Sequence, residues 1–151
     1  MKKIILFAGA FLLTLSVFAQ TKVDDVIKFN VESHDFGKIK QSVPVSYYFE
    51  ITNISDKPVV VQNSWASCGC TTPEKITDPI LPGATAKLKV TYNAAAVSTL
   101  HKDVFVQIAG CDKPKNVKIS GTVLSTADYD KYEKDKAQKG DDNSAKTNDN
   151  K

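Results

Sequence analysis

The stretch VPVSYYFEITN, residues 43–53, decides the fold. Within it, Val45, Tyr47, Phe49 and Ile51 alternate with residues that can face solvent. Successive side chains of a strand point to opposite faces of its sheet, so a period of two is the pattern of a strand with one buried face. The stretch therefore predicts a β-strand whose four apolar or aromatic side chains face the core.

Similar short alternations, broken by Pro, Gly, Asn and Asp, occupy the chain from Val26 to Leu124, and no long run has the period of a helix. Further strands are expected at residues 27–32, 35–37, 59–61, 86–92, 104–108 and 117–123. About seven short strands with frequent turn residues predict an all-β fold, specifically an immunoglobulin-like antiparallel β-sandwich. No cysteine falls in the strands that an inter-sheet disulfide would join, so we expect the core alone to hold the sheets together.

Residues 1–19 are expected to be a secretory signal peptide. Two lysines precede an apolar run over residues 4–18, and Val17 and Ala19 are small residues before Gln20. The run is shorter than the roughly 20 apolar residues of a membrane span. We therefore expect an exported protein, periplasmic or secreted, with no transmembrane anchor after the signal is cleaved.

The rest of the chain divides into two parts. Residues 20–124 are long enough to form the sandwich as one domain with its own core. Residues 125–151 interleave acids and lysines and contain no aliphatic side chain larger than alanine. We expect a charged, mostly disordered tail there, with a short helix around residues 130–137.

The composition argues against two classes of function. The chain has a net charge of +3 and contains no arginine, the side chain that reads phosphate and guanine bidentately. Nucleic acid is therefore not an expected partner. Two histidines and scattered aspartates, without a nucleophile motif, do not make a catalytic set, so we expect neither enzyme activity nor a cofactor.

The least ordinary motif is Cys68-Gly69-Cys70-Thr71, which is expected to lead from a strand into a turn. Together with Trp65, these residues form the candidate functional loop. Trp65 is either a binding anchor or a plug for the end of the sandwich, and the plug is the simpler reading.

This motif and other segments in the same order resemble bacterial proteins that carry domain of unknown function 1573. The matching segments are residues 34–39, 49–53, 58–61, 67–71, 82–83 and 118–123. That family is similar to the immunoglobulin-like domains of the Hydin and major sperm protein type. The resemblance implies a sandwich fold and an exported, envelope-associated setting, and it implies no particular activity.

The sequence leaves open what the three cysteines do. An immunoglobulin-like strand order puts Cys111 at the opposite end of the sandwich from the motif, beyond the roughly 7 Å between Cα atoms that a disulfide tolerates. We therefore expect Cys68 and Cys70 to face each other or a ligand, and Cys111 to be alone. A disulfide between Cys68 and Cys70 would be either a reducible redox pair or a structural lock on the turn.

Metal binding is the weakest of these alternatives. Two thiolates can share a soft ion, and His101 is a weak third candidate from the neighbouring loop, where it is expected to be a rim residue, but a closed zinc site needs four ligands. We expect no metal. His34 is expected to be a strand residue bonded to neighbouring backbone.

Two hypotheses of function follow. The first is a noncatalytic module that binds a protein or a cell-envelope component through strand edges or through the loop around Cys68. The second is a thiol-redox or metal-handling protein that uses Cys68 and Cys70.

Overall fold

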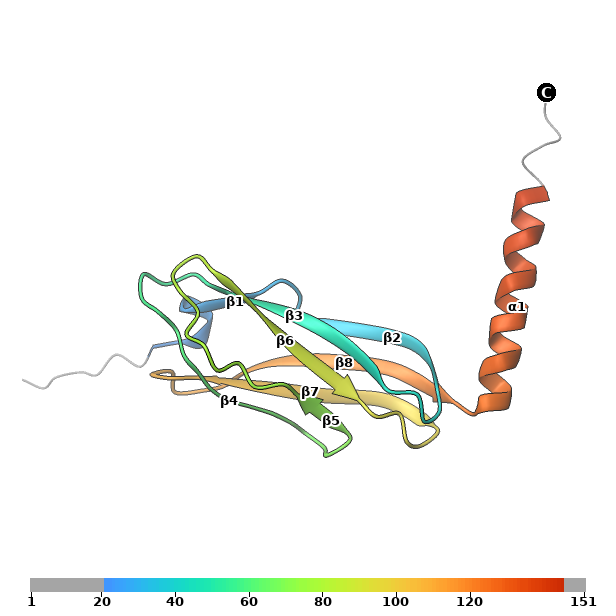
Figure 1. Ribbon diagram of the computed structural model, residues 1–151, viewed down its shortest axis with the longest axis horizontal. Helices are drawn as coiled ribbons and strands as arrows, with labels where there is room; N and C mark the ends of the chain where they lie inside the picture. Colours follow the sequence, from blue (N-terminus) through green and yellow to red (C-terminus); the bar gives the residue numbers. More distant parts are fainter. Residues whose placement is uncertain (1–20, 146–151) are drawn as a thin grey trace, which may run out of the picture.

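The computed structural model describes residues 21–145 of the chain (Figure 1). Its elements in chain order are η1 (Val23–Asp25), β1 (Ile27–Phe29), β2 (Ser33–Lys40), β3 (Val45–Asn53), β4 (Val61–Ala66), β5 (Thr71–Pro73), β6 (Thr85–Tyr92), β7 (Ser98–Ile108), β8 (Lys115–Leu124) and α1 (Thr126–Ala145). The expected signal peptide lies outside the described residues. Over residues 21–145, no helix is both long enough and apolar enough to cross a membrane.

The strands form two four-stranded sheets, in the orders β1-β3-β6-β5 and β2-β8-β7-β4. The predicted all-β, immunoglobulin-like sandwich is confirmed. Eight strands are present over the described residues, against the seven or so expected. The strand missed is β5, because its three residues include Pro73 and show no alternation of apolar and polar side chains.

One pair of strands corrects the antiparallel prediction. β2 runs parallel to β8, whereas the other strand pairs are antiparallel. The chain leaves β1 in the first sheet and enters β2 in the second after three residues, Asn30 to Glu32. The strand expected over residues 27–32 thus ends at Phe29, and residues 30–32 form the connection between the sheets.

The core lies between the sheets and follows the predicted alternation. Phe49 and Ile51 of β3 are fully buried, as are Leu88 and Val90 of the neighbouring strand β6. Val45 and Tyr47 are half-buried and pack against this core. Burial of apolar surface stabilises such a fold by roughly 25 cal/mol per Å², so a core of this kind needs no disulfide between the sheets.

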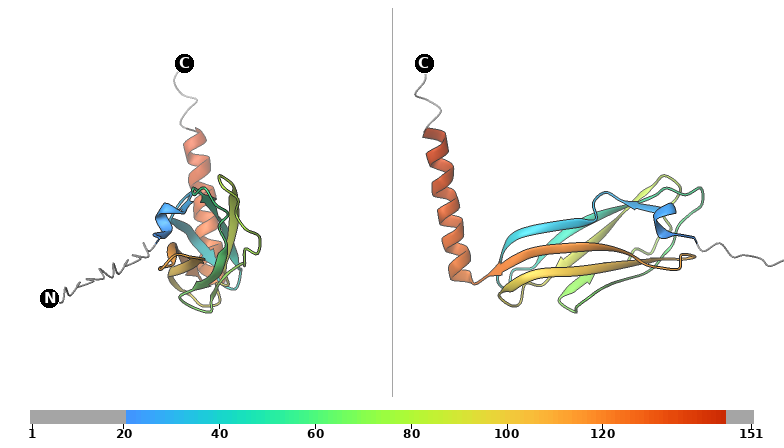
Figure 2. Two further views of the ribbon diagram at one scale, coloured as in Figure 1. Left: turned by 90° about the vertical axis from the view of Figure 1, so that its left-hand side faces the viewer. Right: turned by 180° about the vertical axis from the view of Figure 1, so that it is seen from behind.

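The tail also departs from the prediction. α1 spans 20 residues and extends away from the end of the sandwich (Figure 2), where a mostly disordered tail with a short helix was expected. The helix begins with a capping interaction in which Asp128 N donates to Ser125 Oγ at 3.2 Å. Lys40 Nζ also lies 2.8 Å from Asp130 Oδ1 and joins the first turns to β2. The capping bond and the ion pair to Lys40 support the start of this helix, which has no apolar face.

Candidate functional site

The candidate loop joins β4 in one sheet to β5 in the other, and backbone hydrogen bonds anchor it on both sides. Ser67 N donates to Asp103 O of β7 at 2.9 Å, and Asp103 N donates to Ser67 Oγ at 3.2 Å. On the other side, Asn93 N donates to Cys70 O at 3.0 Å. Thr71 N donates to Cys68 O at 3.2 Å and closes the turn itself.

Cys68 and Cys70 are joined by a disulfide, with their Cα atoms 5.3 Å apart. Both residues are half-buried, and Cys70 packs against the core. Thr71 is 4% exposed, and its Oγ1 lies 3.7 Å from Cys68 Sγ and 3.9 Å from Cys70 Sγ. Gly69 is exposed, and a Cβ added there would meet no other atom of the described residues within 4 Å, so the turn is open on that side in the part of the chain that the structure describes.

Cys111 is unpaired and half-buried. It follows Ile108 of β7, which pairs with Val61, whereas the candidate loop follows Ala66, which pairs with Val104. The third thiol and the disulfide therefore lie at opposite ends of the β4–β7 pair. Burial raises the pKa of the Cys111 thiol, and the neighbouring carboxylate of Asp112 raises it further.

Trp65 does not plug the end of the sandwich. It lies on the outer face of β4, is 38% exposed and stacks on Phe105 of β7, with the ring centroids 5.5 Å apart. The expectation of a plug is wrong, because Trp65 is still part of β4. It pairs with Phe105 of β7, one residue before β4 ends. Its exposed surface leaves the role of binding anchor open.

The two histidines lie in strands of the second sheet, β2 and β7. His101 lies within β7 opposite Ser120, on the outer face, and not in a loop beside the disulfide as expected. His34 lies in β2 with its ring stacked on Tyr47, centroid to centroid 3.6 Å. Over residues 21–145, no group of three or more His, Cys, Asp or Glu side chains could hold a metal ion.

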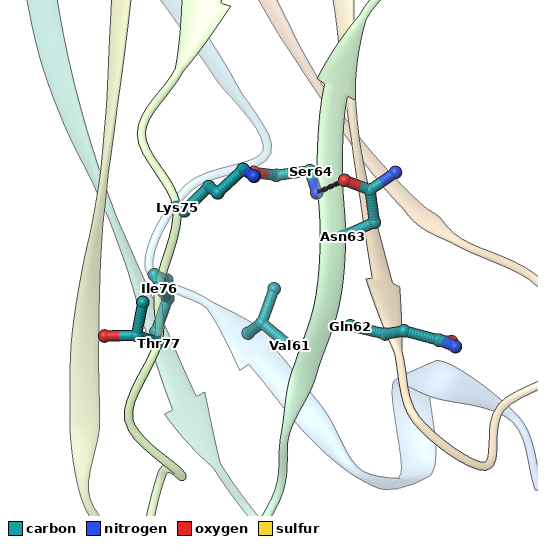
Figure 3. A pocket seen from close by; sticks show the side chains of 7 residues that line it. All are labelled: Val61, Gln62, Asn63, Ser64, Lys75, Ile76 and Thr77. Carbon is teal, nitrogen blue, oxygen red and sulfur yellow. Dashed lines mark hydrogen bonds between the residues drawn. The ribbon is translucent and has the colours of Figure 1, made fainter.

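A cleft of about 270 Å³ lies beside the outer edge of β4 (Figure 3). We call it the β4 cleft, and its lining residues are Val61, Gln62, Asn63, Ser64, Lys75, Ile76 and Thr77. Val61 extends from β4 toward the segment that carries Ile76. Both side chains belong to the core or pack against it and form an apolar patch in the cleft, whereas its other lining residues are polar.

The cleft is closed at its two ends. At one end Ser64 Oγ donates to Glu74 O at 3.3 Å. At the other end Val59 and Ile80 exchange two backbone hydrogen bonds of 2.9 and 2.8 Å. Between these points, residues 75–79 form no backbone hydrogen bond with β4, and Gln62 and Asn63 of the strand are exposed.

The sequence did not indicate this cleft. The expected strand ended at Val61, because Gln62, Asn63 and Ser64 show no apolar alternation. In the structure the strand continues through these residues with an irregularity in its pairing to β7 between Val61 and Asn63. A run of six strand residues without charge or proline is the signal that was available.

Comparison with known proteins gives a family match and several similar folds. A family model described as "Protein of unknown function (DUF1573)" matches residues 27–123. The comparison with curated protein sequences gave no match.

Two solved structures show similar folds. A protein of unknown function from Porphyromonas gingivalis is 14% identical with a TM-score of 0.56, over 64% of this chain and 46% of that one. The ASH / PapD-like domain 7 of human CEP192 is 10% identical with a TM-score of 0.55, over 75% of this chain and 96% of that one.

The secreted serine protease VesC from Vibrio cholerae is also similar, at 12% identity and a TM-score of 0.53, over 67% of this chain and 24% of that one. The chain thus spans less than half the length of both the Porphyromonas protein and the protease. At these identities the likeness shows the fold alone.

Proposed function

The chain belongs to the DUF1573 family, and from that starting point we propose that it is an exported, noncatalytic module that binds an extended polypeptide segment along β4. The observation that carries the proposal is the accessible edge of β4 beside the β4 cleft. The expected signal peptide supports export, because an apolar run of that length after two lysines is typical of secreted proteins.

β4 is the sheet edge with the fewest features that prevent strand addition. Natural edge strands are protected by being short, by lysine or proline, or by bulges. β1 and β5 have three residues each, with Lys28 in one and Pro73 in the other. β2 is bulged between Asp35 and Lys38. β4 has six residues, VQNSWA, without charge or proline, and its own irregularity lies at its start, between Val61 and Asn63, so that residues 63–66 pair regularly with β7.

The backbone of β4 has groups available for a partner strand. Neighbouring residues of a strand direct their backbone groups to opposite sides, and Ser67 directs its own to Asp103 of β7. By this alternation Ala66 and Ser64 point theirs to the outer edge, where over the described residues no strand pairs with β4. The Ser64 N–H is held by Asn63 Oδ1 at 3.0 Å, a local bond that a partner can replace.

The side chains beside this edge indicate the partner's chemistry. A strand added to β4 would turn alternate side chains toward the cleft and toward the outer face. The side chains that turn toward the cleft would contact Val61 and Ile76. Those on the outer face would lie next to Trp65. We therefore expect an uncharged extended segment, with a small apolar side chain for the cleft and an aromatic or β-branched one beside Trp65.

The positions of the histidines support a noncatalytic role. Over residues 21–145, neither His34, which is stacked on Tyr47, nor His101, which lies within β7, forms a side-chain hydrogen bond with a hydroxyl or a thiol. A general base needs a nucleophile within hydrogen-bond reach.

Selection from a phage-displayed library of 12-residue peptides tests the proposal. Peptides that bind the wild-type protein should lose at least about tenfold in affinity with Ser64→Lys, because the new ammonium group lies at the cleft beside Lys75. Ser98→Lys is the matched control, since both serines donate an exposed hydrogen bond to a backbone carbonyl. Equal binding by both variants, or a selection that yields no binder, would reject the proposal.

A further inference from the structure

We propose that the Cys68–Cys70 disulfide undergoes exchange with a dithiol protein, and that the Thr71 hydroxyl stabilises the thiolate that leaves. This activity goes beyond the strand-binding function and does not depend on it. Three features of the turn support it: the small loop that the disulfide closes, the accessibility of the turn, and the position of Thr71.

The disulfide is poorly placed to stabilise the fold. A crosslink stabilises mainly by restricting the unfolded chain, and the effect grows with the number of residues enclosed. Only Gly69 lies between Cys68 and Cys70. The turn is also held by backbone hydrogen bonds from Ser67, Thr71 and Asn93, none of which involves a sulfur atom. The fold should therefore persist when the disulfide is reduced.

The two sulfurs are not equivalent. Cys70 packs against the core, which makes Cys68 the sulfur that an incoming thiolate attacks. The bare side of the turn at Gly69 gives a protein partner room to approach. Exchange rates depend on such access and on the pKa of the leaving thiol.

The Thr71 hydroxyl is positioned to act on the leaving group. The Thr71 side chain is almost fully buried, and the two sulfurs are the partners of its hydroxyl over the described residues. When Cys70 Sγ becomes a thiolate, Thr71 Oγ1–H can donate a charge-assisted hydrogen bond to it, and such bonds are stronger than neutral ones. The Thr71 hydroxyl thus acts on the leaving thiolate by direct contact.

The reaction balances as a two-electron transfer. A thiolate of the partner attacks Cys68 Sγ, a mixed disulfide forms, the Cys68–Cys70 bond breaks, and Cys70 Sγ takes the electron pair. The partner's second thiol loses its proton to solvent and attacks the partner sulfur of the mixed disulfide, which releases Cys68 as a thiolate. The partner's dithiol is oxidised to a disulfide, and Cys68 and Cys70 are reduced.

The test uses the folded protein with reduced thioredoxin as the probe, and counts thiols by alkylation and intact mass. Thr71→Val should slow reduction about tenfold, because a hydrogen bond to a charged group is lost. Thr71→Ser should react at close to the wild-type rate, since it restores the hydroxyl. Thr72→Val, an exposed neighbour on the same strand, should have no effect.

A second measurement separates stabilisation of the thiolate by Thr71 from a merely structural role of this residue. In the reduced protein, the pH midpoint for alkylation of the more acidic thiol of the pair should rise by about one unit in Thr71→Val. Circular dichroism should show that each variant is folded. A wild-type disulfide that thioredoxin reduces only after unfolding, or a folded Thr71→Val that matches the wild type in rate and pH midpoint, would overturn the proposal.

Discussion

The side-chain amide of Asn53, at the end of β3, donates a 2.8 Å hydrogen bond to the backbone carbonyl of Ile80, the residue that closes one end of the β4 cleft. The same amide donates to Lys57 O at 2.7 Å, and Asn53 Oδ1 accepts from Ser55 N at 2.9 Å. Asn53 is fully buried. One polar side chain thus joins a turn of the first sheet to the segment that lines the candidate site.

Asn53→Ala should destabilise the fold by about 3 kcal/mol, because this fully buried side chain would lose its hydrogen bonds to Ile80 O, Lys57 O and Ser55 N, at roughly 1 kcal/mol each. Urea denaturation measures this loss. Asn63→Ala is the control, since that exposed asparagine makes one local bond and should cost less than about 1 kcal/mol. Equal midpoints for the two variants would show that the Asn53 contacts do not hold the turn.

Two glycines should respond differently to alanine. A Cβ at Gly121 of β8 would lie 3.1 Å from the Gly37 carbonyl oxygen and 3.0 Å from Ile39 Cδ1, so Gly121→Ala should cost about 1–3 kcal/mol. Gly69→Ala adds its methyl group to open space and should leave stability within about 1 kcal/mol of the wild type. Thermal unfolding of both variants measures this difference in stability. A lower melting temperature for Gly69→Ala than for Gly121→Ala would contradict the prediction.

The stability of the sandwich should fall below about pH 6.5 because of His34. Burial lowers the pKa of His34 from 6.5, and the nearby Asp35 opposes this shift only in part. As the pH falls through 6.5, the unfolded chain takes up this proton before the folded chain does, so the folded state loses relative stability. Above 6.5 His34 is neutral in both states and adds no pH dependence.

Urea midpoints at pH 7.5 and 5.5 measure this effect. His34→Phe should show a smaller fall between the two pH values than the wild type. If His34→Phe falls as steeply as the wild type, another group is responsible.

Cys111 should be the one titratable thiol of the oxidised protein and should react slowly. Burial raises its pKa, and a thiol with a raised pKa has less of the reactive thiolate at neutral pH. Iodoacetamide with intact-mass detection should add one label in denaturant and add it much more slowly to the folded protein. Labelling of two or more thiols without reductant would contradict the disulfide.

The sandwich could be predicted from the sequence because its long strands alternate cleanly. Val45 to Ile51 show a period of two, and the structure buries that set on one face. The switch between sheets at residues 30–32 could not be predicted, because strand direction and sheet membership depend on pairing partners far along the chain. α1 was underestimated because its support comes from Ser125 and Lys40, and not from an apolar face.

The candidate site was predictable only in part. The spacing of Cys68 and Cys70 and the expected strand order, which puts Cys111 at the opposite end of the sandwich, were sufficient to anticipate which cysteines could meet. The β4 cleft could not be anticipated, because it depends on residues 75–79, which lie beside β4 only in the folded chain. Nor could the sequence show that the hydroxyl of Thr71 lies beneath the disulfide, since a strand residue can face either side.

Amide hydrogen exchange of β4 tests the central proposal most directly. With a selected peptide bound, the backbone amides of Ser64 and Ala66 should exchange more slowly, because the peptide strand would pair with the outer edge of β4. The amides of β2, at the other edge of the same sheet, should be unchanged. Protection at β2 or elsewhere, with Ser64 and Ala66 exchanging as in the free protein, would contradict strand addition at β4.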